Sequence, residues 1–218
     1  MKIFLLTAFF LISCSHHSNH GHSGHTKHHR FDDVKKWEGI FEDPKRDKWQ
    51  KPELVLNTLG IKKTDHIADI GSATGYFPVR LAKRAKRGMV YGIDIEPNLV
   101  EFLNHRAQKE GLKNLISLLG TPNSPLIPAP VDMILTVDTY HHFFHRIEYF
   151  SKLKSKLKRG GRLVVIDFKK GDLPFGPSDN MKISPQEVIE ELKEAGYSLK
   201  ESPDILPYQY ILVFSKSS

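Results

Sequence analysis

Short runs of apolar residues alternate along the chain with longer segments in which apolar residues recur every three or four positions. The short runs predict strands at residues 66–70, 89–95, 115–119, 131–137 and 162–168. The periodic segments predict helices at residues 77–85, 99–109, 147–157 and 184–195. Because strand and helix alternate, we expect an open, mostly parallel sheet that helices cover on both faces.

The two ends of this region depart from the alternation. Residues 31–58 look helical, and a proline interrupts them after Asp43 and again after Lys51. Residues 197–201 and 208–214 predict a final, antiparallel pair of strands. The pattern therefore predicts one α/β domain over residues 31–218, which begins with a helical segment and ends with a strand pair.

The first thirty residues carry a different signal. Met1-Lys2 and an apolar run over residues 3–12 are too short to span a bilayer. The following Leu11-Ile12-Ser13-Cys14 resembles the lipobox of bacterial lipoproteins. The resemblance implies that residues 1–13 are a signal peptide and that Cys14, the single cysteine, is acylated. It also implies a membrane anchor in the cell envelope. The expected location is the outer membrane, on the side that faces the periplasm. A cleaved, unacylated leader or a cytoplasmic location is the alternative.

Residues 14–30 are mostly serine, glycine and histidine, with almost no apolar residue. Such a segment cannot form a core of its own, so we expect a flexible tether. Neutral imidazoles bind transition metals, so weak metal binding is expected of this segment. The spacing has no fixed ligand geometry, and a polar spacer is the alternative. The candidate ligands are His16, His17, His20, His22, His25, His28 and His29.

Acidic residues end the first two predicted strands of the domain. Asp69 is followed by a loop of small residues that opens a helix, an arrangement that lets backbone amides approach a ligand closely. A carboxylate at this point is a poor neighbour for a pyrophosphate but suits a sulfonium and an ammonium group. Asp94 ends the next strand and can accept hydrogen bonds from both hydroxyls of a ribose. A nicotinamide dinucleotide is therefore disfavoured as the ligand.

This pair of motifs resembles class I S-adenosylmethionine (SAM)-dependent methyltransferases, closely over residues 62–170. The resemblance implies a Rossmann-like, doubly wound fold with SAM as cofactor. It places Asp69 beside the methionine part of SAM, the ribose on Asp94, and the adenine near Glu96 and Thr121. The loop beneath the cofactor would consist of Gly71, Ser72, Ala73 and Gly75.

The chain departs from the family pattern at two points. Ala73 stands where a glycine is usual, which we expect the loop to tolerate. Gly120-Thr121 stands where an aspartate often binds the adenine amine. Adenine recognition is therefore expected to use backbone groups near Thr121 or apolar packing.

Polar residues that follow the fourth strand are candidates for the reaction, because in the resembled family this tip faces the methyl group. Asp138, Tyr140 and His141 could take a proton from the acceptor, although positioning alone can promote methyl transfer. His142 is expected to pack.

The helical segment of residues 31–58 could act as a lid over the cofactor. Arg46, Trp49 and Gln50 combine a charge, a ring and an amide there, and Tyr208 could line the acceptor pocket. A packed helix pair whose Trp49 fills the core is the alternative.

The distribution of charge argues against a nucleic-acid partner. The formal net charge is +7, but its basic patches at residues 83–87 and 152–159 lie at helix ends and suit a solvated surface. No interleaving of aromatic and basic residues supports base stacking, so no nucleic-acid partner is expected. The predicted function is methyl transfer to a small-molecule or lipid acceptor by a monomer. A non-catalytic SAM-binding protein and a His-rich metal-handling lipoprotein are the alternatives.

The lipobox predicts that the mature chain begins at an acylated Cys14. Mass spectrometry of the native N-terminus should find acyl chains there. An intact Met1, or a cleaved Cys14 without acyl groups, would count against the anchor.

Overall fold

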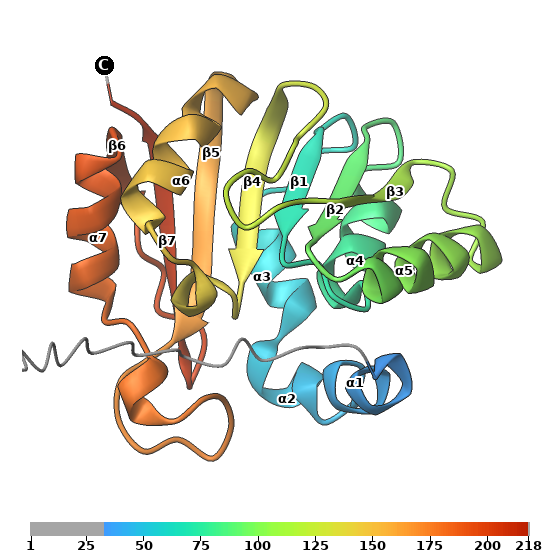
Figure 1. Cartoon of the computed structure of the whole chain (residues 1–218), viewed down its shortest axis with the longest axis horizontal. Coiled ribbons are helices and arrows are strands. Elements are labelled where there is room, and N and C mark those ends of the chain that lie inside the picture. Colours follow the sequence, from blue (N-terminus) through green and yellow to red (C-terminus); the bar gives the residue numbers. More distant parts are fainter. Residues whose placement is uncertain (1–32, 218) are drawn as a thin grey trace, which may run out of the picture.

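A mixed sheet of seven strands forms the centre of the computed structural model, which describes residues 33–217 (Figure 1). The strand order is β3-β2-β1-β4-β5-β7-β6. The first five strands are parallel, and β7 runs antiparallel to both β5 and β6. The predicted mostly parallel sheet with an antiparallel C-terminal pair is confirmed. The bounds are β1 Ile67–Ile70, β2 Val90–Asp94, β3 Leu115–Leu119, β4 Val131–Val137, β5 Leu157–Phe168, β6 Tyr197–Glu201 and β7 Gln209–Lys216.

Helices cover both faces of the sheet because alternate residues of each strand point to opposite sides. In β4, Met133 and Leu135 belong to a core with α3 and α4, whereas Ile134 belongs to a core with α6 and α7. None of the helices within residues 33–217 combines the length and apolar character that a membrane span requires. The helices are α1 Val34–Phe41, α2 Arg46–Gln50, α3 Pro52–Thr58, α4 Tyr76–Arg84, α5 Pro97–Lys109, α6 Arg146–Leu153 and α7 Pro185–Glu194.

The start of β5 differs from the prediction. We expected a helix to residue 157 and a strand from residue 162, but α6 ends at Leu153 and β5 already begins at Leu157. The Gly160-Gly161 pair lies inside the strand, where the pairing with β4 shifts register. Gly160 has φ +73°, and a Cβ atom at Gly161 would lie 3.2 Å from the Asp132 carbonyl oxygen. The two glycines therefore form a β-bulge and do not end the helix.

The carboxyl ends of the parallel strands meet at one edge of the sheet, at the bottom of Figure 1. Helices α1 and α2 lie below this edge, together with the loop of residues 169–184. Ligands of open α/β sheets bind at this edge, so the site is sought there. The signal peptide, Cys14, the tether and its histidines lie outside the described residues.

Candidate functional site

Asp69 is a buried carboxyl group with an unsatisfied oxygen. It is 3% exposed near the end of β1, and its Oδ1 atom has no hydrogen-bond partner among the described residues. The pKa of Asp69 is raised to about 8, mainly by burial and also by the nearby Asp94, while Arg46 opposes the shift. A buried, unpaired carboxylate is costly unless a cation or a hydrogen-bond donor joins it. The position therefore suits a ligand that carries a positive charge.

Asp94 joins the two loops that follow β1 and β2. Its Oδ2 atom accepts the backbone N–H of Ala73 at 2.8 Å, and its Oδ1 atom accepts that of Glu96 at 3.0 Å. Ala73 has φ +45°, a left-handed conformation that favours glycine. The hydrogen bond to Asp94 thus helps to hold Ala73 at the position where a glycine is usual. Burial raises the pKa of Asp94 and the backbone donors oppose the shift.

The small residues of the β1–α4 loop allow close packing. Gly71 has φ +81°, and a Cβ atom there would clash with the side chain of Thr139 at the tip of β4. Gly75 has φ +97°, and a Cβ atom there would clash with Leu103 of α5. The Oγ atom of Ser72 is buried and has no hydrogen-bond partner within residues 33–217. The loop therefore offers a second unsatisfied polar atom beside Asp69.

The two residues predicted near the adenine lie beyond Asp94. Glu96 is the half-buried N-cap residue of α5. Thr121 is exposed, and its hydroxyl group donates to the Ser124 carbonyl oxygen at 3.0 Å in a tight turn. Ile95 and Leu119 are each 50% exposed, and Leu119 pairs with Asp94 in the sheet. Apolar surface therefore adjoins Asp94, while the Thr121 side chain takes part in its turn.

The segment of residues 33–58 is attached to the β1–α4 loop by Glu42, which follows α1. The Glu42 carboxylate accepts a hydrogen bond from the Thr74 hydroxyl group at 2.7 Å. It also forms an ion pair with Arg106 of α5 at 2.8 Å, and Arg106 donates to the Thr74 carbonyl oxygen. This segment therefore contacts the same loop that carries Gly71, Ser72 and Ala73.

A second attachment runs through Arg46 of α2. Its guanidinium group lies 3.3 Å from the Asp138 carboxylate and donates to the Phe41 carbonyl oxygen at 3.0 Å. The same group stacks on the ring of Tyr76 at 4.0 Å, and Arg80 stacks on that ring at 4.1 Å. Arg46 is therefore held by an ion pair, a carbonyl oxygen and an aromatic face at once.

Asp138 accepts hydrogen bonds from three side chains on two segments, α2 and β7, that are far from it in the sequence. Gln50 donates to its Oδ2 atom at 3.2 Å, and Gln209 of β7 donates to its Oδ1 atom. Burial raises the pKa of Asp138 to about 6, the Arg46 ion pair opposes the shift, and Asp167 adds to it. With these three donors in place, the carboxylate fastens the helical segment to the tip of β4. We call the contacts of Asp138 with Arg46, Gln50 and Gln209 the latch.

The remaining tip residues turn in different directions. The Nδ1 atom of His141 lies 2.9 Å from the Asp167 carboxylate, and the two side chains are 3% and 1% exposed. Only Nδ1 of this ring is hydrogen-bonded within residues 33–217, so Nε2 remains for another partner. Tyr140 is buried, and its hydroxyl group donates to Glu191 of α7 at 2.7 Å. Tyr140 therefore points away from His141, while His142 lies exposed beside it.

Trp49 and Tyr208 do meet, in a cluster of four aromatic rings with Phe168 and Phe175. The ring centre of Trp49 lies 5.4 Å from that of Phe175, 5.8 Å from Phe168 and 6.3 Å from Tyr208. Trp49, the residue before Gln50, thus packs against other rings at the edge of the sheet.

Asp167 and Phe175 were not predicted. Asp167 stands near the end of a parallel strand, as Asp69 and Asp94 do, so the same rule applied to β5 would have found it. No local signal marks Phe175, because its partners are distant in the sequence. Within residues 33–217, no three side chains of His, Cys, Asp or Glu are grouped to hold a metal ion.

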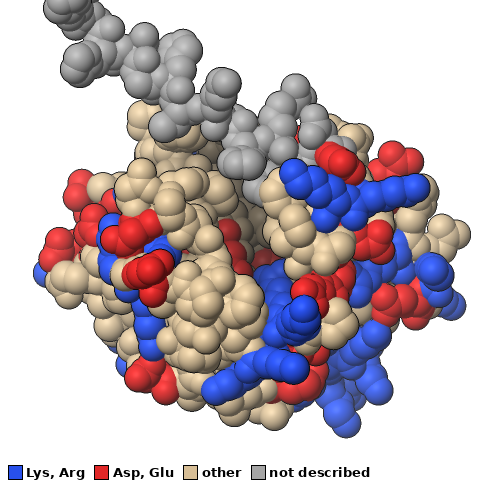
Figure 2. Space-filling model, turned by 90° about the horizontal axis from the view of Figure 1, so that it is seen from below, with Lys and Arg blue, Asp and Glu red and all other residues tan. Residues whose placement is uncertain are grey.

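Surface shape agrees with a site at this edge. Seen from below, the molecule is hollowed between two lobes, with acidic side chains deep in the hollow and Lys and Arg along one side (Figure 2).

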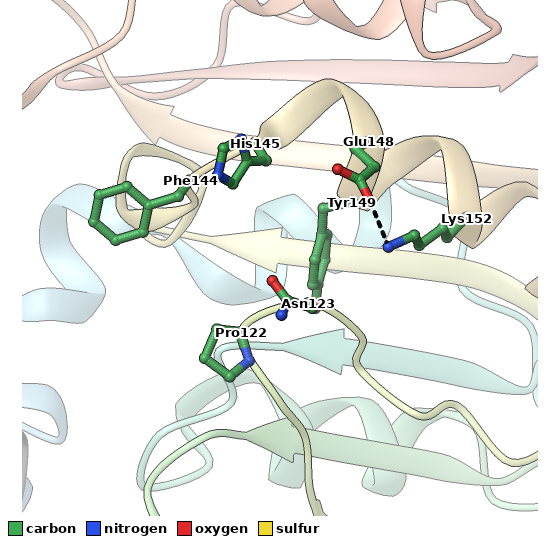
Figure 3. Close-up of a pocket in the computed structure, with 7 residues that line it drawn as sticks. All are labelled: Pro122, Asn123, Phe144, His145, Glu148, Tyr149 and Lys152. Carbon is green, nitrogen blue, oxygen red and sulfur yellow. Dashed lines mark hydrogen bonds and ion pairs between the residues drawn. The ribbon is translucent and has the colours of Figure 1, made fainter.

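A separate shallow groove lies beside α6, where Lys152 pairs with Glu148 at 2.8 Å (Figure 3). None of the acids described above lines that groove, so it is not part of the site. It is lined by Pro122, Asn123, Phe144, His145, Glu148, Tyr149 and Lys152.

Comparison with known proteins defines the class. A family model described as a methyltransferase domain matches residues 61–205. The match covers β1 to β6 and both loops that Asp94 joins. The chain therefore belongs to the methyltransferase domain family.

Individual relatives are distant. A solved structure of a SAM-dependent methyltransferase from Aquifex aeolicus is 29% identical with a TM-score of 0.77, and the match covers 84% of this chain and 97% of that one. Aklanonic acid methyltransferase DauC of Streptomyces sp. (strain C5) is 29% identical over 136 residues, which are 60% of this chain and 61% of that protein. The uncharacterized methyltransferase YdaC of Bacillus subtilis (strain 168) is 24% identical, covering 66% and 78%. The chain thus spans about three fifths of the Streptomyces protein.

The latch predicts that Asp138→Asn loosens the helical segment. The variant removes the charge that pairs with Arg46, and hydrogen bonds to charged groups contribute about 1.5–3 kcal/mol. Amide hydrogen exchange in residues 42–50 should become faster than in the wild type, while exchange in β1 and β4 stays slow. Lys48→Ala, on the exposed side of α2, is the control and should change little. Unchanged exchange in Asp138→Asn would show that the latch does not hold the segment.

Proposed function

We propose that this protein is a SAM-dependent methyltransferase that acts on a small-molecule acceptor. The observation that carries the proposal is the buried Asp69 carboxyl group with its unsatisfied Oδ1 atom, which lies next to the loop clamped by Asp94. Such a site matches a ligand that combines positive charge with ribose hydroxyl groups. Membership of the methyltransferase domain family supports the same assignment.

The residues present fit the cofactor. Asp69 and the Ser72 hydroxyl group would hold the charged methionine part, because both carry buried atoms without a partner. Asp94 would accept the ribose hydroxyls, since each of its oxygens has a second lone pair beyond its backbone donor. Ile95 and Leu119 would cover the adenine by apolar contact. A bound SAM supplies an electrophilic methyl group on its sulfonium.

His141 is the proposed proton acceptor at the tip of β4. Asp167 binds Nδ1, which selects the tautomer with the proton on Nδ1 and leaves the lone pair on Nε2. With SAM supplying the methyl group, Nε2 of His141 would take the proton that the acceptor hydroxyl group gives up. The His141 side chain is 3% exposed, so an acceptor must displace part of its surroundings. Asp138 is assigned to the latch and Tyr140 to packing against α7.

Location is a separate proposal. The lipobox-like Leu11-Ile12-Ser13-Cys14 supports a lipid-anchored enzyme of the cell envelope, whose acceptor would be a small molecule or lipid found there. The described residues do not include this segment.

Cofactor binding is predicted to release a proton at Asp69. At pH 7, a carboxyl group with a pKa of about 8 is mostly protonated, and a cationic ligand favours its ionised form. Calorimetry of SAM binding at pH 7, in buffers of different ionisation enthalpy, should give close to one proton released per ligand. The Asp69→Asn variant should bind more weakly and lack this release.

Asp94→Ala serves as the companion variant and should weaken SAM binding by about 1.5–3 kcal/mol. Its thermal unfolding is compared with that of the wild type to separate binding from folding. Absence of SAM binding by the folded wild type would refute the proposed function.

His141→Gln is predicted to lower kcat by about 10²-fold or more, because a general base typically contributes that much. Asp167→Asn should lower kcat less, since it leaves the imidazole in place but loosens its orientation. SAM affinity should stay unchanged in both. Turnover is measured with labelled SAM and a panel of small alcohols, phenols and amines, with the exposed His105→Gln as control. Full activity in both His141→Gln and Asp167→Asn would mean that positioning alone promotes the transfer.

A further inference from the structure

The aromatic cluster of Trp49, Phe168, Phe175 and Tyr208 is built from four separate parts of the chain. Trp49 belongs to α2, Phe168 ends β5, Phe175 lies in the loop between β5 and α7, and Tyr208 directly precedes β7. The rings of Trp49 and Phe175 are stacked with an interplanar angle of 12°. Phe175 also lies 5.8 Å from Tyr208. Rings from four segments therefore converge on one spot at the edge of the sheet.

The cluster adjoins the polar residues of the proposed reaction. Trp49 precedes Gln50, and Tyr208 precedes Gln209, and both amides donate to Asp138. Phe168 follows Asp167, which orients His141. Because neighbouring Cα atoms lie only about 3.8 Å apart, the four rings sit at the same edge of the sheet as the latch and the His141–Asp167 pair.

The loop that carries Phe175 is held in place by two polar contacts. Asp179 accepts the backbone N–H of Gly171 at 2.6 Å, and the Nζ atom of Lys182 donates to the Gly171 carbonyl oxygen. The Lys182 side chain is 2% exposed, which is unusual for a lysine. Gly176 has φ +98°, and a Cβ atom there would lie 2.7 Å from the Phe168 ring. The loop is therefore fixed against the cluster.

Phe175 is nevertheless 44% exposed. A single exposed ring would need no explanation, but this one stacks on Trp49 beside the proposed site. Its exposed surface extends a planar aromatic surface toward solvent. Planar rings stack on such surfaces more favourably than saturated rings of equal size.

We propose that the methyl acceptor carries a planar aromatic ring and that Phe175, with Tyr208, selects it. The inference rests on the proposed function, and it adds the chemical class of the substrate. Phe175 acts as a specificity-determining residue, while the His141–Asp167 pair serves the reacting hydroxyl group. Acceptors with the same hydroxyl group on a saturated ring lack the stacking and are bound less well.

The test compares 2-naphthol with decahydro-2-naphthol, which has the same skeleton without the flat rings. Calorimetry in the presence of S-adenosylhomocysteine should show tighter binding of 2-naphthol to the wild type. Phe175→Leu keeps an apolar side chain but removes the ring, so the preference should fall by roughly two- to tenfold. Phe175→Tyr should keep the preference. Leu199→Ala, an exposed apolar residue on β6, is the control, and SAM affinity and thermal unfolding should stay unchanged in all variants.

Equal affinity of the wild type for the two alcohols, or an undiminished preference in Phe175→Leu, would overturn the inference. Labelled SAM then separates it from the proposed function. Methylation of saturated but not of aromatic acceptors leaves the proposed function standing and overturns the ring preference. If SAM binds but no acceptor is methylated, the proposed function fails, and the two binding measurements still decide whether the surface selects flat rings.

Discussion

The carboxylate of Asp138 is the contact on which the arrangement of the site depends. It receives donors from α2 and β7 while its own backbone follows β4, and Arg46 and Gln209 lie 92 and 71 residues away from it in the sequence. Three segments are thereby brought to one point, and Lys51, which follows α2, adds a hydrogen bond to the Ile205 carbonyl oxygen before β7. The aromatic rings next to Gln50 and Gln209 follow the same geometry, because their backbones are fixed by the same carboxylate.

The site holds several acidic side chains in buried positions. Asp69 and Asp94 are both buried, and burial raises the pKa of each. A neutral amide at position 69 would relieve that cost, so the retained carboxyl group indicates a site organised for a ligand at some expense of stability. In α2, the guanidinium group of Arg46 pairs with Asp138 and offsets part of the negative charge.

Local sequence patterns were sufficient to predict the sheet and the acidic residues Asp69 and Asp94 near the ends of its strands. The alternation of apolar runs predicted all five parallel strands, although β5 begins five residues earlier than expected. The helix predicted from residue 184 begins where Ser184 forms a capping box with Glu187. The boundary between the predicted helix at residues 147–157 and the following strand was wrong, because glycines such as Gly160-Gly161 are typical of a helix end and of a β-bulge alike. The latch could not be predicted, since nothing near Asp138 in the sequence indicates that Arg46 and Gln209 will meet it. The hydrogen bond from the Tyr140 hydroxyl group to Glu191 could not be predicted either, because its partner lies on a distant helix.

Glu42 and Arg46 lie only four positions apart, yet one contacts the loop beside Asp69 and the other the tip beside His141. Glu42 caps the end of α1 and Arg46 begins α2, so only residues 43–45 separate the two contacts. In the proposed enzyme, one movement of this short stretch would therefore govern the entry of cofactor and acceptor and the departure of both products. Under such coupling, the opening of one hinge between α1 and α3 would limit turnover whichever molecule has to leave, and the rate would be insensitive to the reactivity of the acceptor.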